Sequence, residues 1–186
     1  MAIPYGRLSP EPLPAGRLVG MMKRVMIIAV IGGEEASAEV AHLAEEVGRE
    51  LARRGCTIVC GGGSGVMEAA CRGARAEGGH TIGILPGHNA DESPPNEYVE
   101  FPVFSGLGYA RNSMVALSGQ AVIAIDGAYG TLTEIAYALI HEVPIVGLDT
   151  WDFSYHGHDA ERILRAKDPA DAAEKAVAAA ERRSRR

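Results

Sequence analysis

The sequence is poor in cysteine and in aromatic residues. Its three cysteines, Cys56, Cys60 and Cys71, are an odd number for a chain of 186 residues, which excludes a disulfide framework. None of them has a CxxC partner or a nearby histidine pair, so we expect buried apolar thiols rather than a metal or redox site. Aromatic residues make up only 5% of the chain, which argues against a base-stacking surface for single-stranded nucleic acid.

Long hydrophobic runs and an excess of positive charge are also missing. The longest apolar run, Val25–Ile31, is far too short to span a bilayer, and no signal peptide is recognisable. The formal net charge is −6, whereas a protein that binds the phosphate backbone of nucleic acids needs a basic face. We therefore expect a cytoplasmic protein with neither a membrane nor a nucleic acid as its partner.

Glycine, by contrast, is abundant. Its 23 residues are about 12% of the chain, against a usual share of roughly 7%. Because there is no Gly-X-Y period, the excess must lie in turns or in ligand-binding loops. Backbone N–H groups in such loops can hold a small anion without net positive charge, so an acidic chain can still bind a phosphate-bearing ligand.

From residue 25 onwards, predicted strands alternate with predicted helices. Strands are predicted at 25–31, 57–60, 81–85, 99–104, 121–125 and 144–148, and helices at 36–54, 66–77, 107–117, 131–141 and 171–183. This alternation predicts an α/β fold, a single doubly wound Rossmann-like domain with a mainly parallel sheet of about six or seven strands. Ligands of such sheets bind at the C-terminal ends of the strands, where the glycine-rich turns of this chain fall.

Three segments are distinguished by composition. Residues 1–21 contain four prolines and no apolar period, and are predicted to be a flexible N-terminal tail. Residues 22–165 are the predicted nucleotide-binding domain. Residues 166–186 are predicted to form a closing helix, capped by Asp168 before Pro169, with a basic end that we interpret as a solvated helix terminus.

The first glycine loop, Gly61–Gly65, follows a predicted strand and precedes a predicted helix. Free N–H groups there, with Gly62 and Gly63 as the candidates, could face an anion. The loop is neither a dinucleotide fingerprint, which would need a third glycine at Val66, nor a P-loop, because the chain has no Gly-Lys pair. A tight turn that only packs the strand against the helix is the alternative.

The second glycine loop comprises residues 126–131, with the sequence Asp-Gly-Ala-Tyr-Gly-Thr, and is followed by Glu134. Thr131 and Glu134 have the spacing of an N-cap and its capping-box partner, which would explain both residues without any function. The loop nevertheless lies at the same predicted edge of the sheet as the first one. The isolated Arg111 precedes it, and its guanidinium could pair with a phosphate or with Glu134.

Three stretches in this order, Gly61–Glu68, Arg111–Asn112 and Gly127–Glu134, resemble the LOG ("Lonely guy") family, whose members were once mislabelled lysine decarboxylases. The resemblance extends over residues 23–151. Within that superfamily the chain is most similar to a branch of nucleotide-binding proteins that includes molybdenum cofactor carrier proteins.

The resemblance implies a Rossmann-like fold, at least a dimer, and cleavage of the N-glycosidic bond of nucleoside 5′-monophosphates to a free base and ribose 5-phosphate. Residues 127–131 correspond to the phosphate-binding turn, with Gly127, Ala128, Gly130 and Thr131 as candidate ligands. Arg111 and Glu134 correspond to the catalytic pair. No cofactor is required by this interpretation.

Three residues depart from the pattern of the LOG enzymes: Asp126 replaces a proline, Ala128 a glycine and Thr133 a glutamate. Two hypotheses therefore stay open, a phosphoribohydrolase acting on AMP-like nucleotides and a non-catalytic carrier of a nucleotide or of molybdenum cofactor. We expect no metal site. The short stretch His156–Asp159 is interpreted as an exposed loop because it lacks a third ligand at a suitable spacing.

Overall fold

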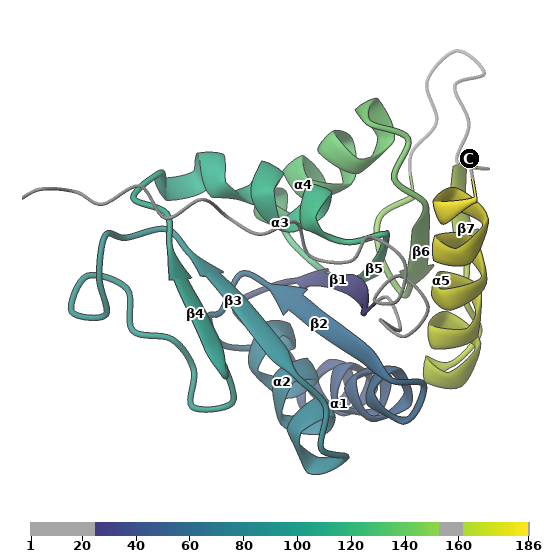
Figure 1. Cartoon of the computed structure of the whole chain (residues 1–186), viewed down its shortest axis with the longest axis horizontal. Helices are drawn as coiled ribbons and strands as arrows, with labels where there is room; N and C mark the ends of the chain where they lie inside the picture. The colour runs from purple at the N-terminus through teal and green to yellow at the C-terminus, as the bar shows by residue number, and fades with distance from the viewer. Residues whose placement is uncertain (1–24, 153–161, 186) are drawn as a thin grey trace, which may run out of the picture.

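A single parallel sheet of seven strands forms the centre of the computed structural model, which describes residues 25–152 and 162–185 (Figure 1). The strand order is β4-β3-β2-β1-β5-β6-β7, and every neighbouring pair is parallel. The strands are β1 (Met26–Gly32), β2 (Cys56–Cys60), β3 (Thr81–Leu85), β4 (Phe101–Phe104), β5 (Ala121–Ile125), β6 (Ile145–Leu148) and β7 (Ile163–Arg165). The predicted fold class is therefore confirmed. The tail 1–21 and the stretch 156–159 lie outside the described residues.

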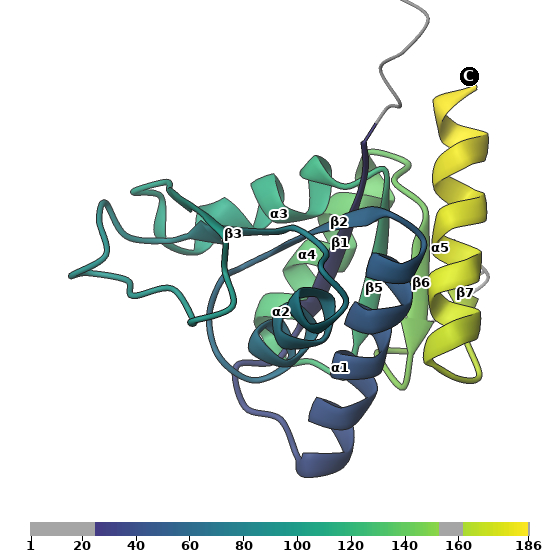
Figure 2. The ribbon, with the colours of Figure 1, turned by 60° about the horizontal axis from the view of Figure 1, so that its bottom comes forward.

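Helices cover both faces of the sheet (Figures 1 and 2). They are α1 (Ala38–Arg53), α2 (Val66–Ala76), the 3₁₀ turn η1 (Gly108–Arg111), α3 (Asn112–Ser118), α4 (Tyr129–Ile140) and α5 (Pro169–Ser184). On β1, Ile28 and Val30 pack against α1, α2 and α5, whereas Ala29 and Ile31 pack against α3 and α4. This alternation buries the strand on both sides, which explains its unbroken apolar sequence.

Four local predictions need correction. The helix predicted at 107–117 is divided into η1 and α3, and α4 begins at Tyr129, two residues earlier than predicted. Ala128 is therefore the N-cap of α4, and the predicted capping role of Thr131 is wrong because this residue lies inside the first turn. Strand β7 was not predicted, because three residues are too few to show an alternation. The cap at Asp168 is confirmed, since its side chain accepts a hydrogen bond from the Asp171 amide at 2.8 Å.

Helices α1 and α2 cross at very close range, and the crossing depends on two glycines. A Cβ atom on Gly48 would lie 2.1 Å from the Ala70 carbonyl oxygen, and one on Gly73 would lie 1.9 Å from the Glu45 carbonyl oxygen. Both distances are far below van der Waals contact, so only glycine fits at either position.

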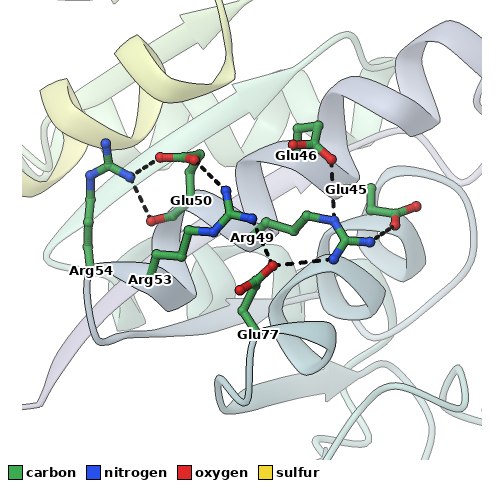
Figure 3. A network of polar contacts seen from close by, with 7 residues as sticks. All are labelled: Glu45, Glu46, Arg49, Glu50, Arg53, Arg54 and Glu77. Atoms are coloured by element: carbon green, nitrogen blue, oxygen red, sulfur yellow. Dashed lines mark hydrogen bonds and ion pairs between the residues drawn. The ribbon is translucent and has the colours of Figure 1, made fainter.

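A network of ion pairs covers the exposed side of the same helix pair (Figure 3). Arg49 contacts Glu45 on its own helix at 2.6 Å and Glu77, just beyond α2, at 3.5 Å; Arg53 also reaches Glu77, at 2.8 Å. Exposed pairs of this kind stabilise a fold only weakly. The close backbone packing beneath the network therefore holds α1 against α2.

Candidate functional site

A cavity of about 450 Å³ opens at the C-terminal ends of β1 and β5. These strands are neighbours at the centre of the sheet. From β1 the strand order runs to β2, β3 and β4 on one side and to β5, β6 and β7 on the other. Such a switch in strand order separates the loops above it and creates a crevice. The cavity is lined by residues 31–35 at the end of β1, Gly61 after β2, Met67 of α2, Tyr109, residues 111–112, and, around the start of α4, residues 126–128, Gly130, Thr131 and Glu134.

The start of α4 presents unpaired backbone donors to this cavity. The first helical hydrogen bond runs from the Leu132 amide to the Ala128 carbonyl, and Ala128 has no side chain that could cap the helix. Within the described part of the chain, the amides of Tyr129, Gly130 and Thr131 have no acceptor. The helix dipole adds positive potential at this end, so the turn can bind an anion.

Gly127 gives this turn its shape. Its φ of +112° lies in a region that side-chain-bearing residues rarely adopt. A Cβ atom there would also lie 2.5 Å from the hydroxyl oxygen of Thr131. The structure thus brings together the predicted residues Gly127, Ala128, Gly130 and Thr131, all of which line the cavity.

Arg111 and Glu134 lie next to each other in the same cavity, and both are buried. An Arg111 guanidinium nitrogen, Nη1, is 3.6 Å from Glu134 Oε1. This separation exceeds that of a charge-assisted hydrogen bond, and Glu134 makes no hydrogen bond to any described residue. Burial raises the pKa of Glu134 to about 8, although the neighbouring Arg111 charge lowers it. The carboxyl is therefore mostly protonated at neutral pH.

Asn112 fixes the position of Arg111. Its side-chain oxygen accepts a hydrogen bond of 2.8 Å from Arg111 Nη1, while its amide nitrogen donates to the Thr133 hydroxyl at 2.9 Å. The Arg111 Nε group is buried and has no acceptor among the described residues. Thr133, which replaces a glutamate of the LOG pattern, is thus engaged in joining α3 to α4 and does not line the cavity.

The first glycine loop contributes less than predicted. Gly61 lines the cavity, but Gly62 and Gly63 do not. Their carbonyl oxygens accept hydrogen bonds from the Asn96 side chain, at 3.2 Å and 2.8 Å, so this part of the loop is anchored to the segment before β4. Gly61 leaves room for the guanidinium, because a Cβ atom there would lie 2.7 Å from both terminal nitrogens of Arg111.

Carboxylates line the cavity in numbers that were not anticipated from the sequence. Glu34 and Glu35 come from the loop after β1, and Asp126 stands at the end of β5 with a φ of +47°. The glycine pair that precedes Glu34 at a strand end was the available signal for this loop. Arg111 is the one basic residue of the lining. The cavity therefore combines hydrogen-bond donors that suit a phosphate, namely the amides at the start of α4 and the Arg111 guanidinium, with carboxylate acceptors from Glu34, Glu35 and Asp126.

The structure also describes the predicted cysteines and bears on the expected absence of metal sites and membrane spans. Cys56, Cys60 and Cys71 are free and buried, as predicted, with the sulfur atoms of Cys60 and Cys71 at 3.5 Å from each other. In residues 25–152 and 162–185, no group of three or more His, Cys, Asp or Glu side chains could hold a metal ion. None of the helices described there is long and apolar enough to cross a membrane.

Sequence comparison agrees with the geometry. The profile of the SLOG cluster4 family (LDcluster4) matches residues 25–177. Cytokinin riboside 5′-monophosphate phosphoribohydrolase of Mycobacterium tuberculosis is 34% identical over 130 residues, which cover 61% of this chain and 65% of the enzyme. The chain thus spans slightly less than two thirds of that relative.

Solved structures with the same fold include two molybdenum cofactor proteins. The molybdenum cofactor binding protein of Rippkaea orientalis is 34% identical, with a TM-score of 0.76 over 84% of this chain and 98% of that one. The molybdenum cofactor carrier protein of Chlamydomonas reinhardtii is 33% identical, with a TM-score of 0.74 over 88% of this chain and 100% of that one.

Proposed function

The chain belongs to the SLOG cluster4 family, and we propose that it binds a nucleoside 5′-monophosphate-like ligand in the cavity above β1 and β5. The supporting observation is the start of α4, where Gly130 and Thr131, whose amides are unpaired, line the same cavity as the buried pair of Arg111 and Glu134. The phosphate binds at these amides, which places the sugar next to Glu134. Tyr109, which lines the rim of the cavity and is 86% exposed, offers a face for the base.

The chemistry that this arrangement allows is hydrolysis of the N-glycosidic bond. Cleavage passes through an oxocarbenium-like sugar, as in glycoside hydrolysis. Neutral Glu134 donates its proton to the departing base as the bond from C1′ to nitrogen breaks. Water then adds to C1′, and the proton it releases restores the acid. Arg111 would orient the ribose and hold the developing charge.

A carrier function is the second candidate, and the comparisons favour it in one respect. The structures of the two molybdenum cofactor proteins match this chain over 98% and 100% of their length, whereas the sequence alignment with the M. tuberculosis enzyme covers 65% of that enzyme. The amides of α4 would hold the phosphate of the cofactor. Glu34, Glu35 and Asp126 would accept hydrogen bonds from the N–H groups of its pterin.

Incubation with AMP and with a cytokinin riboside monophosphate separates the two functions. We expect the wild-type chain to release free base, and Glu134→Gln to bind AMP with unchanged affinity but to release base about a hundredfold more slowly. Equal release by both proteins would contradict the catalytic role of Glu134. Absence of release, together with pterin fluorescence and molybdenum in the purified protein, would favour the carrier.

Gly61→Ala tests whether the position of Arg111 matters to the ligand. The new methyl group would displace the guanidinium, so we expect AMP to bind roughly tenfold more weakly, as measured by calorimetry. Gly63→Ala is the matched control in the same loop, because Gly63 does not line the cavity and its Cβ would come no closer than 3.1 Å to any neighbour, the Met67 methyl group, with Glu34 Oε1 at 3.8 Å. Equal affinities of both variants would contradict the proposed role of Arg111.

A homo-oligomer is part of the proposal. Met114 and Leu117 of α3 are 36% and 38% exposed, and Ile140 at the end of α4 is 71% exposed. Burial of these apolar side chains against a second copy would be favourable. Light scattering should therefore give at least twice the mass of one chain, and Leu117→Glu should shift it towards the mass of one.

A further inference from the structure

The arginines of this chain fall into two classes. Throughout residues 25–152 and 162–185, every arginine except three lies within salt-bridge distance of a carboxylate. The exceptions are Arg162, Arg182 and Arg183. In a protein of net charge −6, which has carboxylates in surplus, three cations without such a partner are unexpected.

These three arginines line one cavity, of about 220 Å³. Arg162 immediately precedes β7, whereas Arg182 and Arg183 belong to the last turn of α5. The cavity lies at the N-terminal ends of β6 and β7, whereas the nucleotide cavity lies at the C-terminal ends of β1 and β5. Ile145, Leu164 and Ala179 give it an apolar floor.

Neutral groups hold two of the guanidiniums in place. Arg162 Nη2 donates to the Leu139 carbonyl oxygen at 3.1 Å, and Arg183 Nη1 donates to the Gly119 carbonyl oxygen at 3.3 Å. These hydrogen bonds fix the side chains, and no carboxylate of residues 25–152 or 162–185 lies within salt-bridge distance of either guanidinium. Glu142 is the one carboxylate of the lining, and it forms no ion pair with any of the three.

The end of a helix alone does not explain this arrangement. Basic residues in a last turn interact favourably with the helix dipole, which accounts for Arg182 and Arg183. Arg162, however, comes from a different element and is exposed, so nothing in the helix requires it to face the same cavity. Convergence of cations from two elements is the pattern of an anion site.

We propose that this cavity is a second ligand site, which takes a small metabolite bearing a phosphate group. The guanidiniums bind the phosphate through paired N–H donors, and the apolar floor accommodates a short carbon skeleton. The site is independent of the nucleotide cavity, since the two share no residue.

A titration with pyrophosphate, monitored through the backbone amide signals in NMR spectra, tests the proposal and distinguishes the two cavities. We expect saturable shifts at residues 163–165 and 179–184, separate from any shifts at 127–131. In the double variant Arg162→Gln/Arg182→Gln, the affinity for pyrophosphate obtained from the signals of residues 163–165 and 179–184 should fall about tenfold or more. Arg185→Gln is the control, because it removes one positive charge from the same end of α5 as Arg182, while Arg185 itself pairs with Glu181 and does not line the cavity.

Three outcomes would overturn the proposal. Equal weakening in Arg185→Gln and in the double variant would indicate general charge attraction. Absence of saturable shifts at 163–165 and 179–184 in the wild-type chain would remove the site, whether or not the variants fold. Tighter binding of citrate than of pyrophosphate at these signals would exclude phosphate as the preferred group.

Discussion

Gly73→Ala is expected to lower the free energy of unfolding by about 3 kcal/mol, as measured by urea denaturation. The added methyl group would lie 1.9 Å from the Glu45 carbonyl oxygen, so α1 and α2 must move apart. Alanine is by contrast the better helix former, by about 1 kcal/mol. A loss of stability in Gly73→Ala would therefore mean that the steric clash between α1 and α2 outweighs the gain in helix propensity.

Gly130→Ala is the matched control for this prediction. Gly130 also lies in a helix, but the nearest atom to a Cβ there is the Asn112 amide nitrogen, at 3.8 Å. The same substitution should therefore be neutral or stabilise the chain by up to about 1 kcal/mol. If Gly73→Ala is as stable as the wild type, the close crossing of α1 and α2 is not needed to hold the fold.

Local patterns were sufficient to predict most of the fold. β3 and β5 begin and end where they were predicted, because an apolar strand flanked by His80 and Pro86, or by Gln120 and Asp126, has clear limits. α4 was predicted to start two residues too late, since Thr131 and Glu134 have the spacing of a capping box. In the structure both face the cavity, and their spacing serves the site rather than the helix end.

The residues of the site could be predicted only where they belong to a recognisable sequence motif. Two glycine loops and the Arg111 and Glu134 motifs led to one side of the cavity, whereas the glycine pair after β1 gave no indication that Glu34 and Glu35 would line it. The environment of Glu134 was not predictable at all. Its altered pKa depends on burial by residues distant in the sequence, which only the folded chain brings together.

Glu134→Gln should make the protein more stable than the wild type as the pH rises. The folded chain keeps the Glu134 proton up to a pKa of about 8, whereas the unfolded chain releases it near the ordinary value of 4.5. Between these values folding takes up a proton, so raising the pH favours the unfolded state of the wild type. Glutamine is neutral throughout and carries no such dependence.

The difference in unfolding free energy between Glu134→Gln and the wild type should therefore grow by about 3 kcal/mol from pH 5 to pH 8. Urea denaturation at four pH values in this range measures it. Glu77→Gln is the control, because the hydrogen bond from Arg53 lowers the pKa of Glu77, which is then ionised in both states above pH 5. Its effect should be constant over the range. A constant effect of Glu134→Gln as well would mean that Glu134 is ionised in the folded chain, and it would then serve as the carboxylate that activates water rather than as the acid that protonates the base.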